Sequence, residues 1–387
     1  MRICLVIDSM GPGGAQQQML RLAESLRAAG ASPTVHWYNA HREFHRLPDG
    51  VSGGVLPKRS VADPAFWRGL HDALRTSEIV HAWLPYPGCY AGLAGLHLRS
   101  APVVHGVRCA PELFAAHPEQ RTATKFAASL ARAVTVNART MGAWLVAQGI
   151  AAERVVHLPN QLAPALLDRP AATPEQNRAT LVGLRLDPDR PPIVCLGRFD
   201  RNKNQIGLLR ALGRLRAAAV AAELPPVVLA GDVQDRAVRS AIEPLAAQAH
   251  LDVRVLAPVA DPVGLLAASR LSVLASLSEG SPNVVLEGLA VGALTVSTRV
   301  GEVPNLVHDE VTGWTCPPGD DAGLAACLHR ALEMPLQAAQ QMGARAQADV
   351  RARFGADAIA RQYLAFYERV VRLGWSRIGA FAGILRG

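Results

Sequence analysis

The stretch SLSEGSPNVVLEGLAVGALTVSTRVGEVPNLV, residues 276–307, places two carboxylates on either side of an expected helix start. Ser281 suits an N-cap and Pro282 the first helical position, so a helix is expected to begin near Pro282. Glu279 then precedes the helix and Glu287 lies inside it. The free backbone N–H groups of the first turn, with the positive end of the helix dipole, form an anion site that suits a diphosphate. On its own, the glutamate pair is equally compatible with surface charges at an ordinary helix cap.

A second motif lies earlier in the chain. Residues 193–197 (IVCLG) are typical of a buried strand, and the basic loop RFDRNKNQ leads from them into a helix with leucines at helical spacing. Only three of the 40 basic residues are lysines, so Lys203 in that loop is expected to have a specific role. Arg198 brings a planar donor fork and Lys203 a point charge, and the two cations together can bind an anion. The alternative is a solvated charge run, although cations at a helix N-terminus are unfavourable unless an anion is bound.

The spacing of the two glutamates, with the flanking motifs SEG, SPNVVLEGLA, VGEVP and GWTCPPGD, resembles the signature of retaining glycosyltransferases of family four. The resemblance implies the GT-B fold, an α/β architecture of two Rossmann-like domains that face each other across a deep cleft. It implies that Glu279 binds hydroxyls of the transferred sugar and Glu287 those of the nucleotide ribose. Arg198 and Lys203 match the cations that contact the donor diphosphate in the family. In the resemblance, the backbone amides of a turn also contact this diphosphate, and that turn consists of Gly280, Ser281, Pro282 and Asn283.

Further site residues follow from the same resemblance. The β-rich runs 227–234 and 253–261 are expected to be parallel strands. In the family the loops after such strands frame the nucleotide base, which assigns Gly231 and Val259 to the nucleotide. Pro258 stands where a glycine is more usual and removes a backbone donor.

The N-terminus predicts a strand, a glycine loop (GPGG) and a helix over residues 15–29. In the family this loop lies close to the donor phosphates and the acceptor, which implies Gly13 and Gly14 as site residues. A plain tight turn is the alternative. Residues 102–108 (PVVHGVR) match a family strand that often ends in a histidine facing the transferred sugar, and that position falls on Arg108. Arg108 is expected to bind an anionic sugar or an acceptor phosphate, and His105 is expected to be either a core histidine or a site residue.

With 387 residues, the chain is long enough for two α/β domains with generous cores. We expect an N-terminal acceptor-side domain over residues 1–170 and a nucleotide-sugar-binding domain over 171–353. A C-terminal helix within 354–387 is expected to cross back to the first domain. No apolar run is long enough to span a bilayer. The six cysteines form no C-x-x-C pair, which favours reduced cytoplasmic thiols, and no metal-ligand cluster is visible.

The net charge of +8 and the isoelectric point near 9.6 imply an acidic partner. Nucleic acid is not expected, because no zinc-finger spacing, RNA-binding strand motif or basic-aromatic alternation is present. An anionic membrane surface that carries a lipid-linked acceptor suits both the charge and the family. The segment from Arg369 to the C-terminus mixes arginines with apolar residues, so it either lies on a membrane or forms a terminal helix with a tail.

The resemblance implies a retaining glycosyltransferase that moves a sugar from a UDP- or GDP-sugar to a glycan or lipid-linked acceptor. Bacterial cell-surface polysaccharide biosynthesis is the expected setting. The enzyme is expected to need no cofactor or metal, and to act in the cytoplasm, peripherally on the inner face of the plasma membrane. Two alternatives stay open: a sugar-nucleotide epimerase with the GT-B architecture, and a catalytically silent sugar-nucleotide-binding module.

Overall fold

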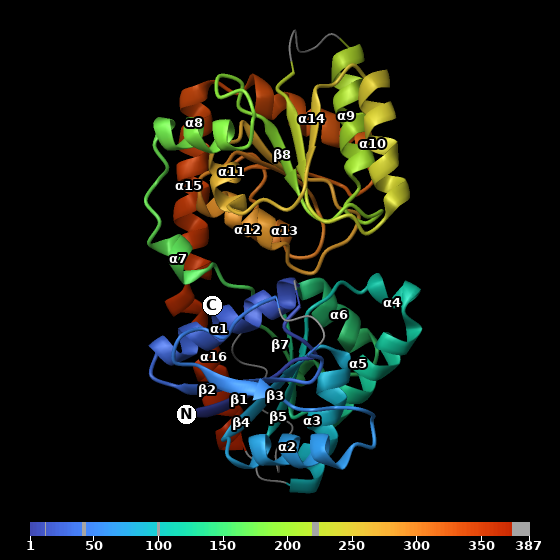
Figure 1. The fold of residues 1–387 in the computed structure, drawn as a ribbon, viewed down its shortest axis with the longest axis vertical. Helices are drawn as coiled ribbons and strands as arrows, with labels where there is room; N and C mark the ends of the chain where they lie inside the picture. Colours follow the sequence, from blue (N-terminus) through green and yellow to red (C-terminus); the bar gives the residue numbers. More distant parts are fainter. Residues whose placement is uncertain (12, 41–43, 99–100, 219–223, 374–387) are drawn as a thin grey trace. The chain divides into compact units, whose positions relative to one another are not determined.

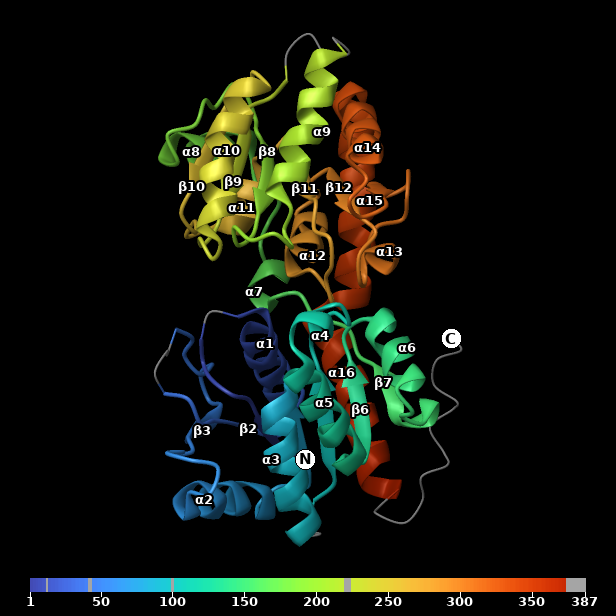
Figure 2. The same cartoon turned by 90° about the vertical axis from the view of Figure 1, so that its right-hand side faces the viewer.

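The computed structural model describes residues 1–11, 13–40, 44–98, 101–218 and 224–373. The chain forms two compact units. Unit 1 comprises Met1–Pro164 and Phe354–Gly387, and unit 2 comprises Ala165–Arg353. Each unit is a parallel β-sheet with helices on its faces (Figures 1 and 2).

Unit 1 contains a seven-stranded sheet in the order β3-β2-β1-β4-β5-β6-β7, with every neighbouring pair parallel. Its strands are β1 (Arg2–Val6), β2 (Ser32–Trp37), β3 (Ser52–Val55), β4 (Ile79–Trp83), β5 (Val103–Val107), β6 (Ala133–Val136) and β7 (Val155–His157). Its helices are α1 (Gly14–Ala28), α2 (Pro64–Arg75), α3 (Pro85–Leu98), α4 (Leu113–Ala116), α5 (Pro118–Leu130), α6 (Arg139–Ala147), the short 3-10 helix η1 (Ala152–Arg154) and α16 (Ala356–Leu373).

Unit 2 contains a six-stranded sheet in the order β10-β9-β8-β11-β12-β13, also parallel throughout. Its strands are β8 (Ile193–Leu196), β9 (Val227–Ala230), β10 (Val253–Leu256), β11 (Leu271–Leu274), β12 (Thr295–Thr298) and β13 (Trp314–Cys316). Its helices are α7 (Pro164–Leu167), which begins at the boundary, α8 (Pro174–Gly183), α9 (Gln205–Ala217), α10 (Arg236–Gln248), α11 (Pro262–Ala267), α12 (Asn283–Ala290), α13 (Val303–Leu306), α14 (Asp321–Glu333) and α15 (Leu336–Phe354).

The apolar runs of the sequence become the central strands because helices cover both faces of each sheet. All four residues of β11 and all four of β9 are buried. The leucines expected on one face of α9 are also buried, and they pack into the core that β8, β9 and β11 share. The parallel strands and the helical spacing predicted from the sequence are therefore confirmed.

Each sheet has one place where the strand order reverses. In unit 2 the chain starts the sheet at β8, adds β9 and β10 on one side, and then places β11 on the other side of β8. In unit 1 the same change of direction separates β1 from β4. In open parallel sheets, ligands bind outside the carboxyl ends of the strands at such a switch point. The fold thus consists of two Rossmann-like units. In each unit, a ligand is expected at the carboxyl ends of the strands beside the switch point.

The C-terminal helix α16 belongs to unit 1, and buried polar contacts fasten it there. His81 in β4 lies 2.7 Å from the hydroxyl of Tyr367 in α16 and 2.9 Å from the hydroxyl of Thr135 in β6. The indole N–H of Trp83 also donates to His81 at 3.1 Å. The segment from Arg369 onward is expected either to lie on a membrane or to form a terminal helix with a tail. Its first residues, 369–373, complete α16, and the rest lies outside the described residues. Within the described ranges, none of the helices combines the length and apolarity that crossing a bilayer requires.

Candidate functional site

An ion pair joins the two loops that flank the switch point of unit 2. The Nζ atom of Lys203, on the loop after β8, lies 2.6 Å from Oε1 of Glu279, on the loop after β11. The side chains are 16% and 15% exposed, so the pair is largely shielded from water yet reachable. The fold therefore brings together a predicted diphosphate cation and a predicted sugar-binding carboxylate that are 76 residues apart in the sequence.

Hydrogen bonds between and within the same loops hold this pair in place. The Asn202 side chain donates to the carbonyl of Ser278 at 2.8 Å, and the backbone N–H of Leu277 donates to the carbonyl of Asn202 at 2.7 Å. Within the first loop, the carboxylate of Asp200 accepts from the backbone N–H of Lys203 at 2.8 Å. Sequence reasoning missed Asn202 and Asp200. The sequence feature that could have identified them is the Asp and Asn content of RFDRNKNQ, because these residues favour hydrogen bonds from their side chains to nearby backbone groups.

Arg198, the other predicted diphosphate cation, lies on the same loop but faces different partners. Its guanidinium donates to the side chain of Gln234 at 3.3 Å and lies 3.4 Å from the carboxylate of Asp200. About half of its side chain is exposed. Arg198 is thus at the same edge of the sheet as Lys203, oriented by the loop after β9, and it keeps free surface for a ligand.

Helix α12 begins at Asn283, one residue later than expected, and Pro282 occupies the cap position with extended backbone. Ser281 is therefore not the N-cap, and Pro282 at the cap position makes no side-chain hydrogen bond to the first turn. The helix follows β11 directly, so its first turn lies at the carboxyl edge beside Glu279. Glu287 lies in the second turn and is half-buried.

The turn before α12 is closed by the VGEVP loop. The backbone N–H of Glu302 donates to the carbonyl of Gly280 at 2.8 Å. Gly301 approaches so closely that an added Cβ would lie 2.0 Å from the carbonyl oxygen of Gly280 and 2.2 Å from that of Glu279. A glycine is required here because any side chain would displace the turn that carries Glu279.

The two residues assigned to the nucleotide base also follow strands of this sheet. Gly231, after β9, packs its backbone against the loop after β8, and an added Cβ would lie 2.1 Å from the carbonyl oxygen of Gly197. Val259, after β10, is half-buried and packs against the core beside α8 and α11. The structure thus gathers every predicted site residue of unit 2 on loops or helix starts at the carboxyl edge of one sheet.

The three remaining predicted residues belong to unit 1. Gly13 occupies the N-cap of α1 and Gly14 is its first residue, where the chain turns from β1 into the helix. The guanidinium of Arg108, just after β5, stacks 3.7 Å from the centroid of the Trp83 ring. It also donates to the hydroxyl of Tyr363 at 2.5 Å and to the carbonyl of Leu158 at 3.3 Å. Arg108 is therefore held in one orientation by its own unit.

His105 is a core residue. It is fully buried, and its burial lowers its pKa to about 4, so it stays neutral at physiological pH. This confirms the core interpretation of His105.

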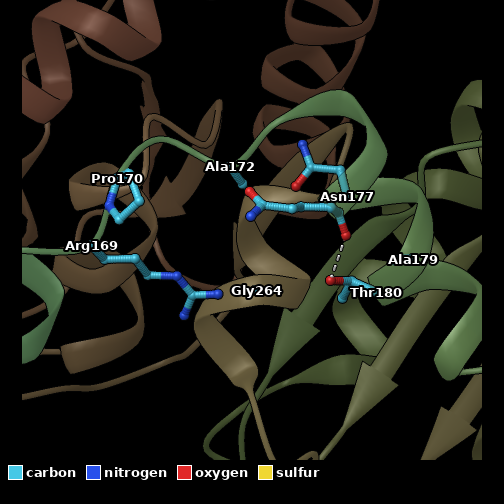
Figure 3. Close-up of a pocket in the computed structure, with 8 residues that line it drawn as sticks. Arg169, Pro170, Ala172, Asn177, Ala179, Thr180 and Gly264 are labelled. Atoms are coloured by element: carbon cyan, nitrogen blue, oxygen red, sulfur yellow. Dashed lines mark hydrogen bonds between the residues drawn. The ribbon is translucent and has the colours of Figure 1, made fainter.

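A separate pocket of about 380 Å³ lies between α8 and the start of α11 (Figure 3). The guanidinium of Arg169 reaches toward Gly264 at one side of it, where it forms two bonds to the carboxylate of Asp261, at 3.0 and 2.7 Å. None of the predicted site residues lines this pocket. Among the residues that the structure describes, no group of three or more His, Cys, Asp or Glu side chains is arranged to hold a metal ion.

Comparisons with known proteins identify the family and the fold. A family model described as "Glycosyltransferase Family 4" matches residues 12–163, and one described as "Glycosyl transferases group 1" matches residues 190–334. The structure resembles crystal structures of HepE from Anabaena with UDP and with UDP-glucose, at TM-scores of 0.82 and 0.80. These alignments cover 95% of this chain and 100% of HepE at 20% and 19% identity. They show the shared GT-B fold.

Two curated relatives match parts of the chain. N-acetyl-alpha-D-glucosaminyl L-malate synthase of Bacillus anthracis is 35% identical over 108 residues, which is 28% of each chain. The lipopolysaccharide core biosynthesis glycosyltransferase LpsD of Rhizobium meliloti is 29% identical over 181 residues, 46% of this chain and 50% of LpsD. The chain thus matches half or less of each relative's length. With the two family models covering both units and the paired loops of unit 2 in place, the protein belongs to glycosyltransferase family 4, the group 1 glycosyl transferases.

Proposed function

We propose that the protein is a retaining glycosyltransferase that moves a sugar from a UDP- or GDP-sugar to a glycan or lipid-linked acceptor. The observation that carries the proposal is the 2.6 Å pair of Lys203 and Glu279 across the switch point of unit 2. A diphosphate needs a cation, and sugar hydroxyls need an oriented acceptor such as a carboxylate. In a nucleotide sugar these two parts are directly bonded, so the groups that bind them must be neighbours.

Each predicted residue then has a role in holding the donor. The diphosphate is held by Lys203, by Arg198, by the turn of Gly280, Ser281 and Pro282 before α12, and by Asn283, the first residue of that helix. Glu287 binds the ribose hydroxyls, while Gly231 and Val259 contact the base. From unit 1, Gly13 and Gly14 contact the donor phosphates, and Arg108 contacts an anionic group of the sugar or acceptor.

The reaction needs charge stabilisation on the leaving nucleoside diphosphate, and this chain offers two cations and a helix N-terminus for it. The bond between the anomeric carbon and the phosphate oxygen breaks, and a bond to the acceptor oxygen forms on the same face. The acceptor's proton passes to the leaving phosphate oxygen, without a covalent sugar–enzyme intermediate. We propose that Lys203 and Arg198 take the place of a metal, so that turnover continues in excess EDTA.

The names of two similar proteins support the proposed donor and the proposed biosynthetic setting. HepE has been crystallised with UDP and UDP-glucose, which favours a uridine donor. LpsD is named for lipopolysaccharide core biosynthesis, which supports a role in bacterial cell-surface polysaccharide assembly. We propose that the enzyme acts in the cytoplasm, peripherally at the inner face of the plasma membrane, where a lipid-linked acceptor would be found.

The proposal is tested by incubating the protein with UDP- and GDP-sugars and a lipid-linked acceptor extract, and by measuring the nucleoside diphosphate released. Release that depends on the acceptor, with a product of the donor's anomeric configuration by NMR, is the expected result. An epimer formed from donor alone would identify an isomerase instead. Donor binding without release, with every acceptor and donor in the panel, would identify a silent binding module.

A further inference from the structure

A second group of polar and aromatic side chains lies at the carboxyl edge of the sheet in unit 1. Four strands that are adjacent in the sheet, β3, β2, β1 and β4, each lead into one member of the group. Lys58 follows β3, Tyr38 follows β2, Asp8 follows β1, and Tyr90 lies in α3 after β4. The group therefore spans the switch point of unit 1 between β1 and β4, where a parallel sheet binds its ligand.

The ammonium of Lys58 is held above two aromatic rings. Its Nζ atom lies 4.7 Å from the centroid of the Tyr38 ring and 5.1 Å from that of Tyr90. The two rings meet edge to face with centroids 5.5 Å apart. Within the part of the chain that the structure describes, no carboxylate lies within ion-pair distance of Lys58. A cation fixed in this way by ring faces can still accept an anionic partner.

Lys58 is also one of only three lysines in a chain whose basic residues are otherwise all arginines. A lysine ammonium is a compact point charge, whereas a guanidinium is a planar fork, so the two are not interchangeable between stacked rings. Lys203 already belongs to the donor site. The retention of lysine at position 58 is consistent with a specific binding role there.

The opposite side of the group offers fixed hydrogen-bonding groups. The carboxylate of Asp8 accepts from the backbone N–H of Ser9 at 2.7 Å and from the side chain of Gln16 at 3.0 Å. The carbonyl of Asp8 accepts from the backbone N–H of Tyr38 at 3.3 Å, which places Asp8 beside the ring that carries Lys58. Gly13 makes room for the Gln16 amide, because an added Cβ would lie 2.1 Å from its oxygen.

We propose that this edge binds the acceptor, and that the acceptor is a sugar bearing an anionic group, either a phosphate or a carboxylate. Lys58 neutralises that group, the Asp8 carboxylate and the Gln16 amide take the hydroxyls, and the exposed ring of Tyr86 in the first turn of α3 packs against the sugar face. That this sugar is the acceptor of the reaction rests on the proposed function. That this edge binds an anionic sugar does not.

The test measures binding of three soluble probes by calorimetry, with the donor site filled by saturating UDP. The probes are methyl glucoside, glucose 1-phosphate and methyl glucuronide, so the two anionic sugars separate a phosphate from a carboxylate source. The variants are Lys58→Gln, Lys58→Arg and Lys125→Gln, the last being a matched lysine change in α5 outside the group.

We expect at least one anionic probe to bind the wild type about tenfold more tightly than methyl glucoside, the gain of one charge-assisted bond. Lys58→Gln should abolish that preference, Lys58→Arg should weaken it because a planar guanidinium does not replace a compact ammonium over these rings, and Lys125→Gln should retain it. Equal binding of all probes, or an anionic preference that survives Lys58→Gln, overturns the proposal. If UDP binds but no preference is seen, only this inference fails. If the preference is seen but neither UDP nor GDP binds, this site stands and the proposed function fails.

Discussion

Lys203 and Glu279 are each other's counter-ions in this structure, so removing either one leaves a largely shielded charge behind. We predict that Lys203→Gln and Glu279→Gln each lower kcat by about 10²- to 10³-fold, the usual effect of losing one group that stabilises the transition state. The losses should have different origins. Lys203→Gln should weaken binding of the nucleoside diphosphate itself, whereas Glu279→Gln should leave that affinity near wild type and weaken only binding of the sugar portion.

The same pair makes a prediction about stability. Because the side chains touch, the double variant should be more stable than the sum of the single changes implies, with a coupling of about 0.5–3 kcal/mol. Thermal unfolding of the four proteins measures this coupling, and Lys125→Gln serves as the control for loss of a lysine. Strictly additive stabilities, or normal turnover in either single variant, would refute the assigned roles.

Glu287 allows a sharper test of the ribose assignment. If its carboxylate binds the ribose hydroxyls, Glu287→Gln should weaken UDP binding by about 1.5–3 kcal/mol, the value of a hydrogen bond to a charged group. Wild-type protein should discriminate strongly between UDP and 2′,3′-dideoxy-UDP, and the variant should not. Calorimetric titration of both ligands measures this. If the variant kept the wild-type preference for UDP over 2′,3′-dideoxy-UDP, Glu287 would not be the group that binds the ribose hydroxyls.

At the scale of the element, the turn before α12 depends on the close approach of the VGEVP loop. Gly301 has φ +51° and no space for a Cβ beside the carbonyl groups of Glu279 and Gly280. We predict that Gly301→Ala costs about 1–3 kcal/mol of stability and displaces Glu279, so turnover falls as well. Unfolding and turnover are measured side by side with Gly183→Ala, a site at the end of α8 with no atom within 4 Å of the added methyl group. Equal behaviour of the two variants would contradict this account of the turn.

The strands and helices predicted from the sequence are those whose residues are buried or half-buried in a regular pattern. Strand β3, with the sequence SGGV and mostly exposed residues, has no such pattern and was not predicted. Strand β9 consists only of apolar residues and α9 presents leucines to the core at helical spacing, so both were predictable from the sequence pattern. The start of α12 was displaced by one residue. Proline fixes its own φ in a range that both a cap and a first helical turn accept, so sequence alone could not decide between them.

The contacts that build the site could be predicted less well. Glu279 and Lys203 were identified by motif, but the bonds that fix their loops, such as that from Asn202 to Ser278, join segments 76 residues apart. The hydrogen bond from Arg108 to the hydroxyl of Tyr363 joins residues that are 255 positions apart, and it depends on where α16 packs. Periodicity reports which face of an element is buried, and it carries no information on which distant side chain meets it.

At the scale of the whole molecule, two neutral histidines in unit 1 should make stability depend on pH. Burial lowers the pKa of His81 well below its usual value and that of His105 to about 4. Well above pH 6.5 both histidines are neutral in the folded and the unfolded state, so neither affects stability there. As pH falls below 6.5, the unfolded chain takes up protons that the folded chain excludes, and stability falls by at most about 1.4 kcal/mol per pH unit for each histidine.

Calorimetric unfolding between pH 7 and 5 measures this slope. The variant His105→Leu, whatever its stability at pH 7, should show a shallower slope by roughly one proton. A stability that stays constant over this range, or a variant with the wild-type slope, would contradict the buried neutral state.

The charge of the molecule is divided unequally between its units. Unit 1 holds 21 Lys and Arg against 12 Asp and Glu, while unit 2 holds 19 against 20. The excess positive charge of the chain therefore lies entirely in unit 1, the unit proposed to bind the acceptor. We predict that the protein sediments with phosphatidylglycerol vesicles at low salt, is released by about 0.5 M NaCl, and ignores phosphatidylcholine vesicles. Salt-independent binding, or no binding to either vesicle, would contradict an electrostatic membrane role.

The central claim is that the ammonium of Lys203 binds the diphosphate of the donor at the switch point of unit 2. Calorimetric titration of UDP and GDP in excess EDTA, into wild type, Lys203→Gln and Lys125→Gln, tests it directly. We predict one site per chain for at least one nucleotide, unaffected by Lys125→Gln and weakened about tenfold or more by Lys203→Gln. Equal affinity in all three proteins, or no binding of either nucleotide, would contradict it.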